Sequence, residues 1–219
     1  KQKGKVQDLI DFASDKDTKG NLAIGHTRWA THGLPNNINA HPHQSSNGKI
    51  SLVHNGIIEN YSVLKKELEQ RGHKFLSDTD TEILVHLIAD IHNNGKQSLF
   101  DSVRLALNEV IGAYAIVVIS DDNSDELIAA RKSSPLVVGL GQGEFFCASD
   151  ATPIIEYTKN VVYLEDGEIA HISLKNGLKL KTIGNQIKTP YIQELEMHLE
   201  ALEKGGYEHF MLKEIYEQP

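Results

Sequence analysis

The sequence is poor in cysteine and has no long apolar run, and each absence excludes a class of protein. Cys147 is the only cysteine among 219 residues, so an intramolecular disulfide framework is excluded. No apolar run approaches the length that spans a bilayer, and no signal-peptide pattern opens the chain. We therefore expect no membrane association and a cytoplasmic location.

Basic residues are also scarce relative to acidic ones. Lys and Arg number 22 against 30 Asp and Glu, which gives a net charge of −8. Nucleic acids and anionic membrane surfaces both require clustered Lys and Arg, so neither is expected as a partner. Hydrophobic residues make up 40% of the chain and charged residues 24%, as in an ordinary globular protein that buries a core.

Neither end of the sequence resembles a natural terminus. Lys1 is not a translation start, and residues 216–219 carry no obvious stop signal. We therefore expect a fragment of a longer protein. The Gly205-Gly206 pair begins a stretch that looks like a tether, so the expected domain covers residues 1–204 and the expected linker covers residues 205–219.

Apolar runs with β-branched residues and helical apolar spacing predict an α+β fold. We predict strands over residues 22–27, 50–53, 113–119, 127–130, 136–140, 144–148, 161–164, 168–173 and 178–182. We predict helices over residues 60–70, 81–92, 99–110 and 192–202. An Asp-Gly pair at residues 165–168 predicts a hairpin turn. Strands that follow one another without helices favour antiparallel sheets.

Arg28 and Trp29 follow the predicted strand 22–27, where side chains leave the sheet and become reachable. A guanidinium group donates two parallel hydrogen bonds to a carboxylate, which makes Arg28 a candidate binding residue. A structural or surface role is the alternative for an arginine taken alone. Trp29, the only tryptophan, fits the core or the wall of a pocket equally well.

Asn55 and Gly56 form an Asn-Gly pair directly after the predicted strand 50–53. An Asn side-chain N–H and a Gly backbone N–H suit an oxyanion hole, since Gly lets a substrate approach the backbone closely. A simple Asn-Gly turn is the alternative. That alternative is weakened because Ile57 and Ile58 do not continue a regular hairpin alternation.

Asp80 lies immediately before an apolar helical segment, within Thr79-Asp80-Thr81-Glu82. An Asp or Thr followed by Glu at this spacing is a helix-capping signature. Asp80 either caps the helix or holds a substrate ammonium group, with a neighbouring residue as the cap. The sequence leaves both roles open.

Histidine and cysteine are the remaining candidates for chemistry. His41 and His43 flank Pro42, and their spacing includes no acidic ligand, so we expect no metal site. Cys147 lies between Phe146 and Ala148, where a cysteine is typically a small buried hydrophobe. No residue of the sequence therefore looks like a nucleophile.

Several segments, taken in order, resemble the glutaminase domain of the glutamine:fructose-6-phosphate amidotransferase family. They are residues 26–33, 39–43, 54–61, 77–82, 134–141, 163–168 and 211–219, and the resemblance covers the whole chain. Related enzymes of purine and asparagine synthesis share the Asn-Gly and acidic elements. The His-Thr-Arg-Trp-Ala-Thr-His-Gly run and the C-terminal segment are more particular to this family.

The resemblance implies a glutamine-binding site. Arg28 would bind the α-carboxylate of glutamine and Asp80 its α-ammonium, while Asn55 and Gly56 would form the oxyanion hole. The implied remaining contacts are Trp29, Thr31 and His32 in a loop that closes over glutamine, and His41 near the pocket.

The resemblance also implies a fold and a reaction. The family fold is the four-layer αββα sandwich of N-terminal-nucleophile hydrolases, and no cofactor is implied. A cysteine at the mature N-terminus attacks the amide, and the ammonia passes to a sugar-isomerase domain that binds fructose-6-phosphate, in a full-length protein expected to be a homo-oligomer. This chain begins downstream of that nucleophile, so we expect the fragment itself to be inactive and to expose an unpaired sheet edge.

Two alternatives stay open at this point. The runner-up is a phosphoribosyl-pyrophosphate amidotransferase, which the C-terminal segment and Thr31-His32-Gly33 disfavour. The other is a non-catalytic binding module. The missing nucleophile favours the module, whereas the intact substrate clamp and oxyanion pair argue against it.

Overall fold

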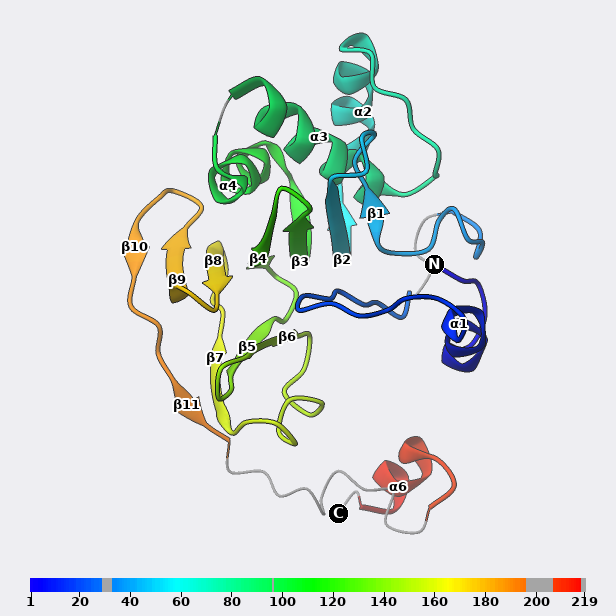
Figure 1. The fold of residues 1–219 in the computed structure, drawn as a ribbon, viewed down its shortest axis with the longest axis vertical. Helices are drawn as coiled ribbons and strands as arrows, with labels where there is room; N and C mark the ends of the chain where they lie inside the picture. The colour runs from blue at the N-terminus through cyan, green and yellow to red at the C-terminus, as the bar shows by residue number, and fades with distance from the viewer. Residues whose placement is uncertain (29–32, 96, 196–206, 218–219) are drawn as a thin grey trace.

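The computed structural model describes residues 1–28, 33–95, 97–195 and 207–217, which form an α+β fold (Figure 1). The helices are α1 (Val6–Ala13), α2 (Tyr61–Gln70), α3 (Asp80–Gly95), α4 (Leu99–Glu109) and α6 (Phe210–Glu217). The strands are β1 (His43–Gln44), β2 (Ile50–Ile58), β3 (Gly112–Ser120), β4 (Asn123–Lys132), β5 (Val137–Leu140), β6 (Phe145–Ala148), β7 (Asn160–Tyr163), β8 (Glu168–Ser173), β9 (Gly177–Thr182), β10 (Ile187–Lys188) and β11 (Gln193–Glu194). None of the described helices is long and apolar enough to cross a membrane.

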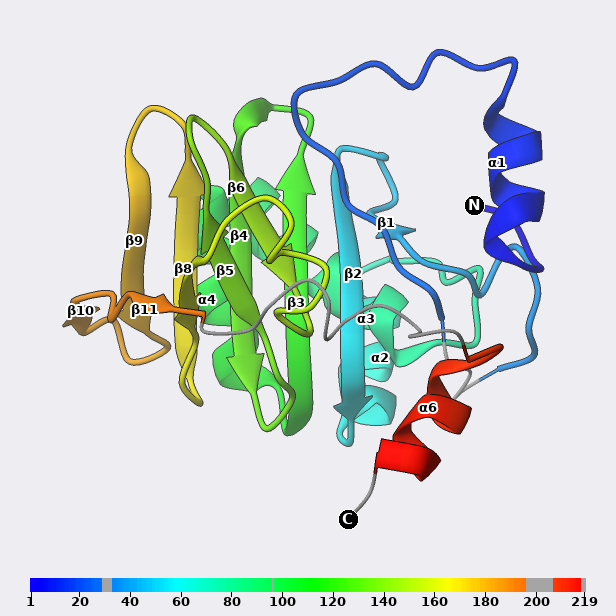
Figure 2. The same cartoon turned by 90° about the horizontal axis from the view of Figure 1, so that it is seen from below.

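The strands form two antiparallel sheets. The larger sheet has seven strands in the order β1-β2-β3-β4-β8-β9-β10, and the smaller has four in the order β11-β7-β5-β6. Every strand-to-strand ladder in both sheets is antiparallel. Figure 2 shows the large sheet spread across the molecule with the small sheet in front of it. The predicted α+β class with antiparallel sheets is confirmed.

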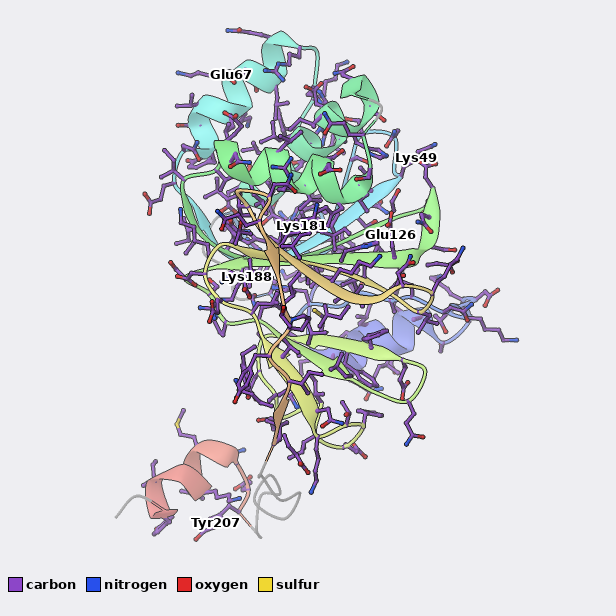
Figure 3. The ribbon with its side chains drawn as sticks, turned by 90° about the vertical axis from the view of Figure 1, so that its left-hand side faces the viewer. Lys49, Glu67, Glu126, Lys181, Lys188 and Tyr207 are labelled. Carbon is purple, nitrogen blue, oxygen red and sulfur yellow. The ribbon has the colours of Figure 1, made fainter. Side chains whose placement is uncertain are left out.

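Helices α2, α3 and α4 cover one face of the large sheet, as Figures 1 and 3 show. The alternation of side chains along β3 explains how this strand serves two cores. Ile116 and Val118 belong to the cluster under the helices, whereas Ala115 and Val117 belong to the cluster between the sheets. Because β3 is buried on both faces, its sequence is a continuous apolar run and not an alternating one.

The small sheet packs against the other face of the large sheet. Val138 on β5 and Val162 on β7 meet Val117 and Ala129 of the large sheet in one buried cluster. The outer face of the small sheet packs against the turn segment that contains Ile154. Three layers are thus defined by the described residues, and the four-layer αββα arrangement stays a prediction.

Two predicted elements are wrong, and a third differs where the structure describes it. Residues 22–27 are not a strand, because their backbone pairs with none of the described strands. The turn at residues 165–168 forms, but it joins β7 of the small sheet to β8 of the large one, so it is not a hairpin. The helix expected over residues 192–202 begins instead as β11, paired with β7, and residues 196–206 lie outside the described part of the chain.

Candidate active site

A cavity of about 150 Å³ lies where β2, the start of α3 and the segment before residue 29 meet. It is lined by His26, Thr27, Arg28, His41, His54, Asn55, Gly56, Thr79, Asp80 and Thr81. The cavity therefore brings together five predicted site residues, namely Arg28, His41, Asn55, Gly56 and Asp80. The other three, Trp29, Thr31 and His32, lie outside the described residues.

Asp80 lines this cavity, and its neighbour Thr79, not Asp80, caps the helix. The side chain is 4% exposed, and Oδ2 accepts a hydrogen bond from the backbone N–H of Ile58 at 2.8 Å. The hydroxyl oxygen of Thr79 accepts instead from the backbone N–H of Glu82 at 3.4 Å, in the position of a helix cap. The capping role belongs to Thr79, which leaves Asp80 as a cavity-lining residue.

Glu82 fixes the turn that leads into α3. Its carboxylate accepts hydrogen bonds from the backbone N–H groups of Leu76 and Ser77, at 2.9 and 2.6 Å, and from the hydroxyl of Ser77 at 2.6 Å. Burial opposes its ionisation, but hydrogen bonds from His86, Ser77 and these amides outweigh burial and hold the pKa of Glu82 at about 2. The turn that precedes Asp80 is thus held by the ionised carboxylate of Glu82.

Asn55 and Gly56 lie within β2 and not in a turn. Gly56 pairs with Tyr114 across the ladder to β3, and its φ of +136° is one that residues with a Cβ rarely adopt. A Cβ at Gly56 would overlap the carbonyl oxygen of Ala113. The simple Asn-Gly turn is therefore excluded, and a bare stretch of backbone borders the cavity.

Arg28 lines the cavity from the segment that follows the α1 region. Its guanidinium donates to the carbonyl oxygens of Gly33 and Leu34, at 3.2 and 3.3 Å. These bonds orient the planar guanidinium, which carries five N–H donors in all. One small cavity thus combines a cation, an anion and amide N–H donors, a set that fits a zwitterionic amino acid with a side-chain carbonyl.

Histidines make up much of the remaining wall, and sequence reasoning assigned no role to His26 or His54. His26 Nε2 lies 2.7 Å from Asn55 Oδ1, and buried His54 lies with Nδ1 3.0 Å from the hydroxyl oxygen of Thr81. Burial, followed by repulsion from His26, lowers the pKa of His41 to about 2. Among the described residues, no three metal-ligating side chains are arranged to hold an ion. The run of histidines was the available signal, but only the structure shows their contacts.

A second cavity of about 280 Å³ adjoins the first and extends between the two sheets to Cys147. The two cavities share His26, Thr27, His54 and Asn55. Burial raises the pKa of the Cys147 thiol to about 12. Cys147 therefore lies close to the site, but its raised pKa disfavours the reactive thiolate.

The chain is similar to several known proteins. A family described as "Glutamine amidotransferase domain" matches residues 13–195. Proteins named glutamine–fructose-6-phosphate aminotransferase (isomerizing) are 58% identical in Bacteroides thetaiotaomicron and 52% in Chlorobaculum tepidum, over 100% of this chain, and 50% in Pyrococcus horikoshii, over 99%. This chain spans 36% of the length of each.

Solved structures extend the comparison to the fold. The structure of glutamine phosphoribosylpyrophosphate amidotransferase from B. subtilis with ADP and GMP is 29% identical, with a TM-score of 0.59 over 74% of this chain and 35% of that chain. The structure of the allosteric regulatory enzyme of purine biosynthesis is 30% identical, with a TM-score of 0.55 over 67% of this chain and 31% of that chain.

Proposed function

This chain belongs to the family of glutamine amidotransferase domains, and from that premise we propose that its cavity binds glutamine and hydrolyses the side-chain amide to glutamate and ammonia. The observation that carries the proposal is that Arg28, Asp80 and the Asn55-Gly56 pair line one cavity of about 150 Å³. Glutamine has an anionic and a cationic end and an amide that becomes an oxyanion under attack. The cavity offers a suitable partner for each.

Arg28 and Asp80 form the clamp for the amino-acid end of the substrate. The guanidinium of Arg28 binds the α-carboxylate through parallel N–H donors, and the carboxylate of Asp80 binds the α-ammonium. Asp80 Oδ2 accepts a hydrogen bond from the backbone N–H of Ile58 at 2.8 Å, and Oδ1 accepts a longer one from the hydroxyl of Thr81 at 3.5 Å, so the carboxylate keeps acceptor sites for the ammonium. Because Arg28 and Asp80 hold both charged groups at one end of the substrate, the length of its side chain determines where the amide carbon lies.

Asn55 and Gly56 stabilise the oxyanion. A thiolate attacks the amide carbon, the carbonyl electrons move to oxygen, and the side-chain N–H of Asn55 and the backbone N–H of Gly56 donate to that oxygen. Collapse of the tetrahedral intermediate breaks the C–N bond, and the nitrogen takes a proton and leaves as ammonia. Water then hydrolyses the thioester, which yields glutamate and restores the thiol.

We assign the attack to a thiol other than Cys147. Burial raises the pKa of that thiol to about 12, so it carries almost no thiolate near neutral pH. The family resemblance assigns the attack to a cysteine at the mature N-terminus, whose α-amine accepts the thiol proton. A polypeptide restricted to these 219 residues therefore has the substrate-binding groups of the reaction and no reactive thiol.

For the intact protein, we propose transfer of the ammonia to fructose-6-phosphate, which gives glucosamine-6-phosphate. Relatives named for that reaction are 46 to 58% identical, whereas the phosphoribosylpyrophosphate enzyme is 29% identical, which favours the first over the second. In this proposal residues 1–204 are the amidotransferase domain and residues 205–219 lead toward a sugar-isomerase domain. The intact protein is then a cytoplasmic homo-oligomer that needs no cofactor.

Substrate analogues test the clamp in the intact protein. Arg28→Ala should lower kcat/KM for glutamine and for 4-carbamoylbutanoate, which keeps the α-carboxylate, by about 10- to 100-fold, because a hydrogen-bonded charge contributes about 1.5–3 kcal/mol. The same change should hardly affect 4-aminobutanamide, which lacks that carboxylate. Asp80→Asn should instead lower kcat/KM for glutamine and for 4-aminobutanamide, which keeps the ammonium, and should hardly affect 4-carbamoylbutanoate, which lacks it. Ammonia release measured against substrate concentration gives all values.

Trp29→Phe is the control for this experiment, because it keeps both charged ends of the substrate bound. It should change the glutamine KM far less than Arg28→Ala does. Equal glutamine KM values in the wild type and in Arg28→Ala would contradict the clamp. Absence of any glutamine-dependent ammonia release from the intact wild-type protein would contradict the proposed function itself.

A further inference from the structure

The side chain of Asn55 is held from one side by His26. Asn55 is exposed on β2, and its Oδ1 lies 2.7 Å from His26 Nε2, although the two residues are 29 positions apart. An amide oxygen only accepts hydrogen bonds, so His26 Nε2 must carry the hydrogen and donate it. With Oδ1 engaged in this bond, the amide N–H groups of Asn55 are turned away from His26.

His26 is itself oriented by a second histidine. The rings of His26 and His41 stack with centroids 4.2 Å apart and an interplanar angle of 20°. His41 Nδ1 accepts a hydrogen bond from the backbone N–H of His54 on β2 at 3.3 Å. The pKa of His41 is about 2, lowered first by burial, so the stacked ring is neutral. The stack therefore ties His26 to the same strand that carries Asn55.

No other described group competes for His26. Its Nδ1 is buried and has no hydrogen-bond partner among the described residues. Among the described residues, Asn55 is thus the hydrogen-bond partner of the His26 ring. A buried nitrogen without a hydrogen-bond partner is unfavourable, so the ring is not oriented by a bond to Nδ1. The contacts that orient it are the stack on His41 and the hydrogen bond to Asn55.

We propose that His26 is a positioning residue for the oxyanion hole, because its Nε2–H fixes the amide of Asn55 with the N–H end toward the cavity. The inference rests on the proposed function, in which Asn55 is an oxyanion donor. A donor that is already oriented stabilises developing charge without reorganisation during the reaction. A freely rotating amide would also present its oxygen to the oxyanion, which is repulsive.

Variants of His26 in the intact protein test the inference through a split between kcat and KM. His26→Ala should lower kcat for glutamine hydrolysis by about 10- to 100-fold, a large part of the 100- to 1000-fold lost when an oxyanion donor is removed. The glutamine KM should change by less than about 3-fold, because the charge clamp is untouched. His26→Gln, whose amide N–H reaches as far as Nε2, should recover most of kcat. His26→Asn, which is shorter, should not.

His171→Ala is the matched control for loss of a partly buried histidine. His171 pairs with Glu126 at 2.8 Å (Glu126 is labelled in Figure 3) and lines neither cavity at the site. Its removal should leave kcat and the glutamine KM unchanged. Thermal melts followed by circular dichroism identify any variant that fails to fold, and the rescue by His26→Gln supplies a reading that does not depend on His26→Ala.

A double-mutant cycle with Asn55→Ala completes the test. If His26 acts through Asn55, then His26→Ala should hardly lower kcat any further in a protein that already carries Asn55→Ala. Additive losses in the double variant, or a loss confined to KM, would overturn the inference. A normal loss in Asn55→Ala with full activity in His26→Ala would also overturn it while leaving the proposed function intact. Full activity in Asn55→Ala would instead overturn the oxyanion role.

Discussion

Gly56 shows, at the scale of a single residue, how backbone sterics place a site within a strand. Its φ of +136° and its close approach to the carbonyl oxygen of Ala113 leave no room for a Cβ. The same bare backbone borders the cavity next to Asn55. The identity of this residue is therefore set by the ladder between β2 and β3 as well as by the chemistry of the site.

Gly56→Ala should be much more destabilising than a glycine substitution that only strains φ. We expect the free energy of unfolding to fall by about 3 kcal/mol, because the backbone strain of about 1–3 kcal/mol is joined by the overlap with Ala113. Gly143→Ala is the control: its φ is +74°, but no atom lies within 4 Å of an added Cβ, so about 1 kcal/mol should be lost. Urea denaturation measures both, and equal losses would contradict the steric argument.

At the scale of elements, the start of α3 depends on a carboxylate in its own first turn. Glu82 reaches back to the amides of Leu76 and Ser77, and Thr79 caps the helix. This arrangement leaves Asp80 free of a capping role at the wall of the cavity. The capping signature in the sequence was real, but it could not say which acidic or hydroxyl group performed the capping.

Glu82→Gln should lower the free energy of unfolding by about 2 kcal/mol at pH 7, because a buried charged acceptor is replaced by a neutral amide. The pKa of Glu82 is about 2 in the folded protein against an ordinary 4.5, so its stabilisation is complete above pH 4.5 and is lost as the pH falls toward 2. The difference between wild type and variant should therefore shrink across that range. Denaturation curves at several pH values measure it.

Glu67→Gln is the control for this pH series. Glu67 lies on the outer side of α2, labelled in Figure 3, and its pair with Arg71 at 4.0 Å is exposed. The change should cost less than about 0.5 kcal/mol at every pH. A loss in Glu82→Gln that does not depend on pH would show that packing, and not the ionised carboxylate, stabilises the turn.

At the scale of the whole molecule, the packing of the two sheets places the half-buried Cys147 on the wall of the second cavity, beside the site. Its side chain packs against the cluster between the sheets, and its pKa is raised to about 12 by burial. The second cavity brings this thiol into the neighbourhood of Asn55, and among the described residues no positive charge offsets the burial that disfavours the thiolate. Proximity alone does not make it the nucleophile.

Cys147 should therefore react slowly in the folded protein, because its raised pKa leaves little thiolate. At pH 8 its reaction with an aromatic disulfide reagent should be on the order of 1000-fold slower in the folded protein than in guanidinium chloride, where the thiol has its ordinary pKa. Cys147→Ala should leave ammonia release by the intact protein unchanged. Loss of that activity in a variant that still folds would identify Cys147 as a participant in the reaction.

The sequence by itself determined most elements and the local chemistry. The apolar spacing over residues 81–92 and 113–119 predicted α3 and β3, because helix and strand periods are set by neighbours a few positions apart. Motif order alone pointed to Arg28, Asn55, Gly56 and Asp80 as one site, and the structure brings them to one cavity.

Only the tertiary structure decided which distant groups meet. It assigned β7 and β8 to different sheets despite the Asp-Gly turn between them, since a turn fixes local geometry but not which sheet accepts each strand. It also paired His26 with Asn55 across 29 positions and packed the half-buried Cys147 against the cluster between the sheets. These outcomes depend on burial and packing between segments far apart in the chain, and no local pattern encodes them.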